Sequence, residues 1–79
     1  MDRESIRQQL EPIFEEVFGE KVPVTDELTA RDVANWDSLN HMVLITKTEE
    51  SFGIKFSLRD LNKMKNVGAL MDIIESKIG

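Results

Sequence analysis

The sequence of 79 residues contains no cysteine, and this absence excludes several kinds of chemistry together. Without a thiol the chain forms no disulfide, no thiolate metal site and no cysteine nucleophile. Its single histidine and scattered carboxylates do not have the spacing of a metal site, and its four glycines form no phosphate-binding loop. We therefore expect neither a bound metal nor an enzyme.

The sequence also lacks an excess of positive charge and a long apolar run. Fifteen acidic residues outnumber ten basic ones, giving a formal net charge of −5, whereas nucleic acids and anionic membranes bind basic faces. The longest strongly apolar run, Met42 to Ile45, is far shorter than the ~20 residues needed to span a bilayer. The first residues do not resemble a signal peptide. We expect a cytoplasmic protein without a nucleic-acid or membrane partner.

The length allows one small domain, and we expect residues 1–79 to form it. Apolar residues make up 41% of the chain, which is enough for one modest core. The chain begins at Met1 and ends at Gly79 without a linker, which favours a free-standing protein. A monomer is expected because no large apolar stripe remains once the helices pack.

What the sequence does contain is apolar residues at helical spacing. Residues 4–18 carry an amphipathic stripe, with Ser5 and Gln8 resembling a capping box. Pro12 lies inside this stripe and predicts either a kink or a firm helix that begins only near Glu11. Residues 38–52 are apolar over most of the helical circumference, which predicts a central helix surrounded by neighbours.

Two further helices are expected in the second half of the chain. Ser57 and Asp60 form a capping-box pattern that opens a short helix over residues 57–63, and Asn66 is a plausible N-cap for a helix that extends to about residue 77. No convincing strand is found. Residues 19–37 predict a long loop pinned across the core, in which Thr29 to Asp32 could cap one helical turn. The fold class is therefore all-α: a four-helix bundle of three longer helices and one short helix, with a long loop between the first and second helices.

The residues that carry chemistry gather at the start of the second helix, in the stretch Trp36 to Met42. Serine and aspartate are both strong N-cap residues, so one reading is that Asp37 or Ser38 only caps the helix. A nucleophilic pair of Ser38 and His41 is disfavoured, because the sequence has one histidine, no Gly-rich oxyanion loop and little room for a pocket. A hydroxyl at a helix N-terminus is instead well placed to carry an anionic group, such as a phosphodiester, at the positive end of the helix dipole.

At this point the sequence resembles the acyl carrier protein family. Asp37-Ser38-Leu39 enters an apolar helix halfway along an acidic helical domain, Phe52-Gly53-Ile54 follows at the spacing of the family, and Val67-Gly68 lies in a segment, 66–74, that resembles the start of its last helix. The resemblance covers nearly the whole chain. It implies a four-helix bundle in which Ser38 carries 4'-phosphopantetheine, transferred from coenzyme A, with an acyl group held as a thioester on the terminal thiol.

The resemblance also implies roles for other residues. Asp37 and Leu39 would flank the attachment site. A phosphopantetheinyl transferase and the enzymes that load and process the acyl group would be partners, and the residues expected to meet them are Asn40, His41, Met42, Val43, Lys47 and Arg59. Thr46, at a position expected to look inward, would line the acyl chain together with Leu61 and Met64. Leu39, Met42 and Val43 could equally belong to the core.

Charge distinguishes this sequence from the carriers of fatty-acid synthesis that it resembles. Those carriers have an acidic second helix, whereas this chain has Asn40, Val43 and Lys47 there and the basic residues Lys55, Arg59, Lys63 and Lys65 around the third helix. Since charge selects partners, we predict a specialised carrier for fatty-acid-like, polyketide, peptide or other dedicated biosynthesis. An aminoacyl (peptidyl) carrier and a helical interaction module that carries nothing are the alternatives.

Overall fold

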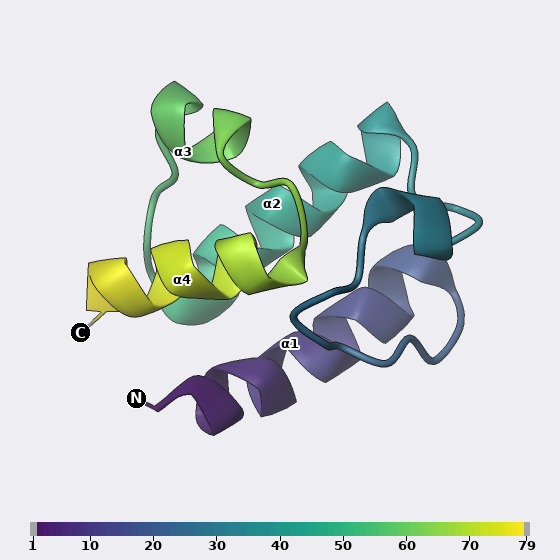
Figure 1. The fold of residues 1–79 in the computed structure, drawn as a ribbon, viewed down its shortest axis with the longest axis horizontal. Coiled ribbons are helices and arrows are strands. Elements are labelled where there is room, and N and C mark those ends of the chain that lie inside the picture. Colours follow the sequence, from purple (N-terminus) through teal and green to yellow (C-terminus); the bar gives the residue numbers. More distant parts are fainter. Residues whose placement is uncertain (1, 79) are drawn as a thin grey trace.

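The chain folds into four α-helices joined by one long and two short connections (Figure 1). The computed structural model describes residues 2–78; the expected inclusion of Met1 and Gly79 in the domain lies outside the described residues. The helices are α1 (Arg3–Phe18), α2 (Ser38–Phe52), α3 (Leu58–Asn62) and α4 (Val67–Ile78), and a 3-10 turn, η1 (Ala30–Asp32), lies in the long loop. No strand occurs within residues 2–78. The all-α, four-helix prediction is confirmed.

Helix α1 begins earlier than predicted and is capped by a different residue. The Asp2 side chain accepts a hydrogen bond of 2.8 Å from the Ser5 backbone N–H, so the predicted capping box of Ser5 and Gln8 is wrong. The helix is one continuous element through Pro12, and the prediction of a firm helix beginning only near Glu11 is also wrong. Pro12 and Gln8 are both exposed. The Gln8 carbonyl, which loses its helical donor at Pro12, therefore lies on the solvent side, where water can hydrate it.

The other predicted helix boundaries agree with the structure within one or two residues. Helix α2 has the predicted bounds and ends at Gly53, whose φ of 66° is left-handed. The predicted capping box of Ser57 and Asp60 is present at α3. At η1, the Thr29 backbone N–H donates to the Asp32 side chain at 3.0 Å, so this segment forms one capped turn as predicted. Asn66 caps α4 through a hydrogen bond of 2.8 Å from the Ala69 N–H to its side-chain oxygen.

The core is shared by α1, α2, α4 and the long loop, which runs back along α1 before turning toward α2 (Figure 1). The loop contributes four buried side chains, so its predicted pinning across the core is confirmed. The fully or nearly buried apolar residues are Ile6, Leu10, Ile13, Phe14, Phe18, Val22, Val24, Leu28, Val33, Leu44, Ile45, Val67, Leu70, Met71 and Ile74.

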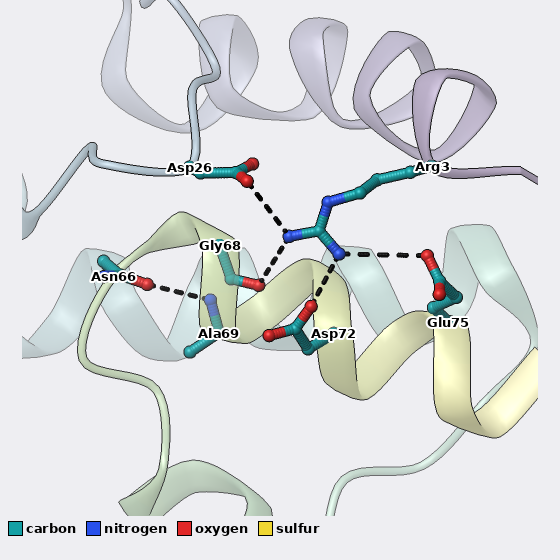
Figure 2. Close-up of polar contacts among 7 residues, drawn as sticks. All are labelled: Arg3, Asp26, Asn66, Gly68, Ala69, Asp72 and Glu75. Atoms are coloured by element: carbon teal, nitrogen blue, oxygen red, sulfur yellow. Dashed lines mark hydrogen bonds and ion pairs between the residues drawn. The ribbon is translucent and has the colours of Figure 1, made fainter.

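One arginine ties the start of α1 to the loop and to α4 (Figure 2). The Arg3 guanidinium lies 2.6 Å from Asp72 Oδ1, 3.4 Å from Asp26 Oδ2 and 3.8 Å from Glu75 Oε2. It also donates to the Gly68 carbonyl at 3.1 Å. Because three segments converge on one side chain, this cluster fixes the end of the bundle where α1 begins.

Helix α2 is not surrounded by neighbours, contrary to the prediction. Leu44, Ile45 and Thr48 are buried, but Leu39 is 73% exposed and Met42 is 50% exposed. No described element covers the outer side of the first two turns. The apolar side chains there therefore face solvent beside Ser38.

Candidate functional site

Three consecutive residues at the start of α2 have three different environments. Trp36 is half-buried, Asp37 is the N-cap, and Ser38 is the exposed first residue of the helix. The Asp37 Oδ1 atom accepts a hydrogen bond of 2.8 Å from the Asn40 backbone N–H. Of the two capping candidates that the sequence leaves open, Asp37 takes the cap. The Ser38 side chain is thus not needed to cap the start of the helix.

The loop before the site is anchored on both sides. Asn35 donates from its side-chain amide to the carbonyl of Phe18, the last residue of α1, at 3.0 Å. Asn40 donates from its side chain to the Asn35 carbonyl at 2.7 Å, closing a small loop across the helix start. These bonds couple the orientation of α2 at Ser38 to the end of α1. They also engage the Asn40 side chain, which was expected to face a partner.

Trp36 packs inward among aromatic rings. Its ring centroid lies 5.7 Å from that of Phe14, edge to face, and 5.2 Å from that of Phe18. Its indole N–H donates to Nδ1 of His41 at 3.0 Å, and the two rings are stacked with centroids 6.1 Å apart. The polar edge of Trp36 is thereby satisfied although the ring is largely removed from water.

His41 is therefore engaged with Trp36 through its Nδ1 atom. Burial lowers the pKa of His41 below its ordinary value of 6.5, which keeps the imidazole neutral near pH 7 and its Nδ1 free to accept. The geometry gives no support to the disfavoured nucleophilic pair with Ser38. It also leaves less of His41 available to a partner than the sequence suggested.

A shallow hollow surrounds Ser38 on the surface, and a smaller, partly open pocket beside it reaches toward the core. The surface hollow is lined by Ala30, Trp36, Asp37, Ser38, His41 and Met42. This inner pocket, of about 60 Å³, is lined in part by the buried Leu44 and Leu70, by the half-buried Met64 and by the exposed Lys65. Of the three predicted acyl-chain-lining residues, Met64 is the one that lines this pocket.

The other two predicted lining residues lie elsewhere. Thr46 is exposed, so the expectation that it looks inward is wrong. The buried threonine is Thr48, whose hydroxyl donates to the Leu44 carbonyl at 2.7 Å. Sequence reasoning missed it, although its spacing of four from Leu44 and three from Ile45 places it on the buried stripe. Leu61 is half-buried but is not among the residues that line the inner pocket.

The residues expected to meet partners fall into two groups. Met42, Val43 and Lys47 line a shallow groove along α2 with Leu39, Thr46 and Glu50. The Lys47 ammonium pairs with Glu16 of α1 at 2.9 Å. Arg59 is exposed on α3, outside this groove. The outer side of α2 next to Ser38 is therefore apolar, and its one positive charge, that of Lys47, is partly neutralised by Glu16.

Comparison with known proteins gives full-length relatives. The chain is 35% identical over 78 residues to an acyl carrier protein of Thermotoga maritima, which covers 98% of this chain and 96% of that protein. It is 37% identical over 79 residues to an acyl carrier protein of Coprothermobacter proteolyticus, covering 99% of this chain and 96% of that one. No protein-family model matches the sequence.

A solved structure is similar in both fold and sequence. The solution NMR structure of a holo acyl carrier protein from Geobacter metallireducens superposes with a TM-score of 0.87 and 43% sequence identity. The match covers 92% of this chain and 85% of that one. At this identity the likeness extends beyond the fold.

Proposed function

The chain belongs to the acyl carrier protein family, and on that premise we propose that Ser38 is the residue that bears its prosthetic group. Like its family, the protein is a non-catalytic carrier that holds acyl groups as thioesters on a 4'-phosphopantetheine arm. The alternatives of a non-carrier module and a peptidyl carrier lose their support, because the full-length relatives are acyl carriers.

One observation carries the proposal: the Ser38 hydroxyl is exposed at the first residue of α2 while its neighbour Asp37 caps the helix. A serine that capped the helix would have its oxygen turned toward the backbone N–H groups of the first turn. Ser38 does not cap the helix. Its hydroxyl is accessible to a transferase without any cost to the helix.

The surroundings of Ser38 suit a phosphodiester. The first backbone N–H groups of a helix have no partner within the helix. Asp37 satisfies that of Asn40, which leaves those of Ser38 and Leu39 at the positive end of the helix dipole. An anion attached to the Ser38 oxygen would therefore lie where the helix favours negative charge.

The group, when bound, would supply the thiol on which an acyl chain is carried, a function that the cysteine-free sequence cannot supply itself. The chain's own residues hold and present it. Asp37 fixes the start of α2, and Asn35 and Asn40 fix the approach of the loop. The exposed Leu39 side chain follows directly after the attachment point.

A phosphopantetheinyl transferase and acyl-processing enzymes are the partners of this family, and we propose the outer side of α2 as the surface that they contact. Helix α2 has no acidic residue before Glu49, about three turns beyond Ser38, and the carboxylate among the groove-lining residues is Glu50. A partner suited to Leu39, Met42 and Lys47 would present an apolar face with little positive charge. This supports the specialised carrier rather than one that serves a strongly basic ketosynthase surface. Efficient elongation of the acylated protein by a ketosynthase of general fatty-acid synthesis would contradict it.

We also propose that residues 1–79 form a single, monomeric, cytoplasmic domain. No helix within residues 2–78 is long and apolar enough to cross a membrane. Light scattering coupled to gel filtration measures the oligomeric state, and a mass twice that of the chain would refute the monomer.

The experiment that tests the attachment site is intact-mass measurement after incubation with coenzyme A and a broad-specificity phosphopantetheinyl transferase. The wild type and Ser76→Ala, a control at an exposed serine of α4, should both gain one phosphopantetheine. Ser38→Ala should gain none while keeping its helical circular dichroism. A gain in Ser38→Ala, or none in the wild type with a second, cognate transferase, would refute the proposal.

A further inference from the structure

The surface hollow at Ser38 and the partly open inner pocket share a wall. Ala30, Trp36 and His41 line both spaces, whereas Ser38 and Met42 line only the outer one and Met64 only the inner one. Trp36 and His41 are the large side chains of this wall. A phosphopantetheine arm on Ser38 that turned toward the inner pocket would pass this pair, with the acyl group at its far end.

We propose that the Trp36–His41 pair is a partition that keeps the carried acyl chain out of the interior, so that a chain longer than a few carbons lies outside the bundle. The inference rests on the proposed function of Ser38. It goes further because it assigns Trp36 and His41 as specificity-determining residues, and it sets a limit on the acyl group that this carrier can shelter.

The size of the inner pocket supports the limit. At about 60 Å³ it is less than half of the about 150 Å³ that admits benzene in an engineered protein cavity. The space behind the partition therefore accommodates only a very short apolar group. A longer chain needs the volume now occupied by the two rings.

The bonding of the pair supports its role as a closed wall. The indole N–H donates to His41 Nδ1 at 3.0 Å, and the indole is held from behind by Phe14 and Phe18. Moving His41 aside would leave the half-buried indole N–H without its acceptor, which is unfavourable. Moving Trp36 would disrupt the aromatic cluster. Neither ring yields to an acyl chain without a loss elsewhere.

The outer surface offers the excluded chain a place to lie. Leu39 and Met42 are exposed on the same side of α2 as the outer hollow, within one turn of Ser38. An acyl chain outside the bundle can cover these side chains and thereby lose part of its own exposure to water. It would also remain accessible to partner enzymes.

The test measures how well the protein shields the thioester from a small nucleophile. Acetyl and octanoyl arms are loaded onto Ser38 from the corresponding acyl-coenzyme A, intact mass verifies the loading, and hydroxylamine cleavage is followed by mass. Rates are normalised to those of the free acyl-coenzyme A. In the wild type the normalised rates for acetyl and octanoyl should be equal. In His41→Ala the octanoyl rate should fall about tenfold, the factor expected when roughly two methylene groups gain shelter from water, while the acetyl rate stays unchanged.

A second partition variant and a control complete the set. Trp36→Phe keeps an aromatic ring but removes the N–H donor, and it should also slow octanoyl cleavage. Ser76→Ala, at an exposed serine of α4 that lines neither space, is the control and should leave both rates unchanged. The Met64 methyl resonance gives a second readout, which should shift on octanoyl loading in His41→Ala but not in the wild type.

The outcomes separate the two proposals. An octanoyl thioester already shielded in the wild type, or unshielded in both partition variants once their fold is verified by circular dichroism, would overturn the partition. Failure of the wild type to gain an arm would instead refute Ser38 as the attachment site, and the partition with it.

Discussion

The division of roles between Asp37 and Ser38 predicts that stability and function respond to different substitutions. In Asp37→Ala, the Asn40 N–H loses its acceptor and a negative charge disappears from the positive end of α2. Removing an N-cap side chain costs about 1 kcal/mol. Losing a surface charge at the helix end costs roughly another 0.5 kcal/mol. We therefore expect Asp37→Ala to lower the free energy of unfolding by about 1.5 kcal/mol, which in a domain of this size lowers Tm by roughly 6–12 °C.

Two matched variants separate the components. Asp37→Asn keeps a capping oxygen and loses only the charge, so its cost should be about 0.5 kcal/mol. Ser38→Ala removes no cap, because Asp37 holds that position, and its stability should lie within about 0.5 kcal/mol of the wild type.

Thermal unfolding followed by circular dichroism, and urea unfolding followed by Trp36 fluorescence, give these values for the unmodified protein. In the transferase assay Ser38→Ala should lose all modification. The reasoning would be refuted if Ser38→Ala were as destabilised as Asp37→Ala, because Ser38 would then be the structural cap.

Three further substitutions or titrations test other parts of the structure. Gly68→Ala should destabilise the protein by up to about 2 kcal/mol in urea unfolding, since a Cβ there would lie 3.0 Å from the Asp26 carbonyl oxygen and overpacking outweighs the gain in helix propensity. Burial lowers the pKa of His41 in the folded protein. The stability that the neutral imidazole contributes is therefore complete above pH 6.5 and is lost as the pH falls toward the pKa of the folded state. NMR titration should show a pKa below 6.5 for His41, and Trp36 fluorescence should change as Nδ1 gains a proton. The hydrogen bond from the Ser57 backbone N–H and, to a smaller extent, that from Lys77 lower the pKa of Asp60 to about 2. The Ser57 amide resonance should therefore shift only as the pH falls from about 4 toward 2, where Asp60 is protonated and the anchoring of α3 is lost.

Each of these has a clear contrary result. Gly68→Ala as stable as the wild type would mean that the loop at Asp26 yields without cost. A folded His41 that titrates at or above 6.5 would mean that its imidazole is solvated. Movement of the Ser57 amide well above pH 4 would mean that the α3 capping box is not formed.

Local signals predicted most of the secondary structure because they depend on neighbouring residues. The capped turn at η1, the capping box at α3 and the Asn66 cap each need only a side chain and a backbone N–H three residues away. Only Asp2 was missed as a cap, and the apolar stripe of α1 starts too late to reveal it. Pro12 shows the limit of a local rule, since its cost depends on whether the orphaned carbonyl faces water.

The candidate site could be predicted only in part, because burial depends on elements far away in the chain. The sequence placed Ser38 at the start of a helix, but it could not decide between Asp37 and Ser38 as the cap, since both residue types suit the position. Nor could it show that the apolar side of α2 lies open, which depends on where α1 and α4 pack. The error at Thr46 has a simpler origin. The stripe that continues Leu44 and Ile45 passes through Thr48, and the register could have been found from the sequence.

The arrangement at the start of α2 depends on the order of three residues. Trp36 is in the extended segment before the helix and turns its ring toward α1, where Phe14 and Phe18 surround it. Asp37 has the extended backbone of an N-cap, with φ of −102° and ψ of −176°, which directs its carboxylate along the helix start. Ser38 is the first residue with helical geometry, and its side chain projects from the helix surface. Shifting this order by one position would bury the hydroxyl or expose the indole, so the attachment point and the wall behind it are set by the same turn of chain.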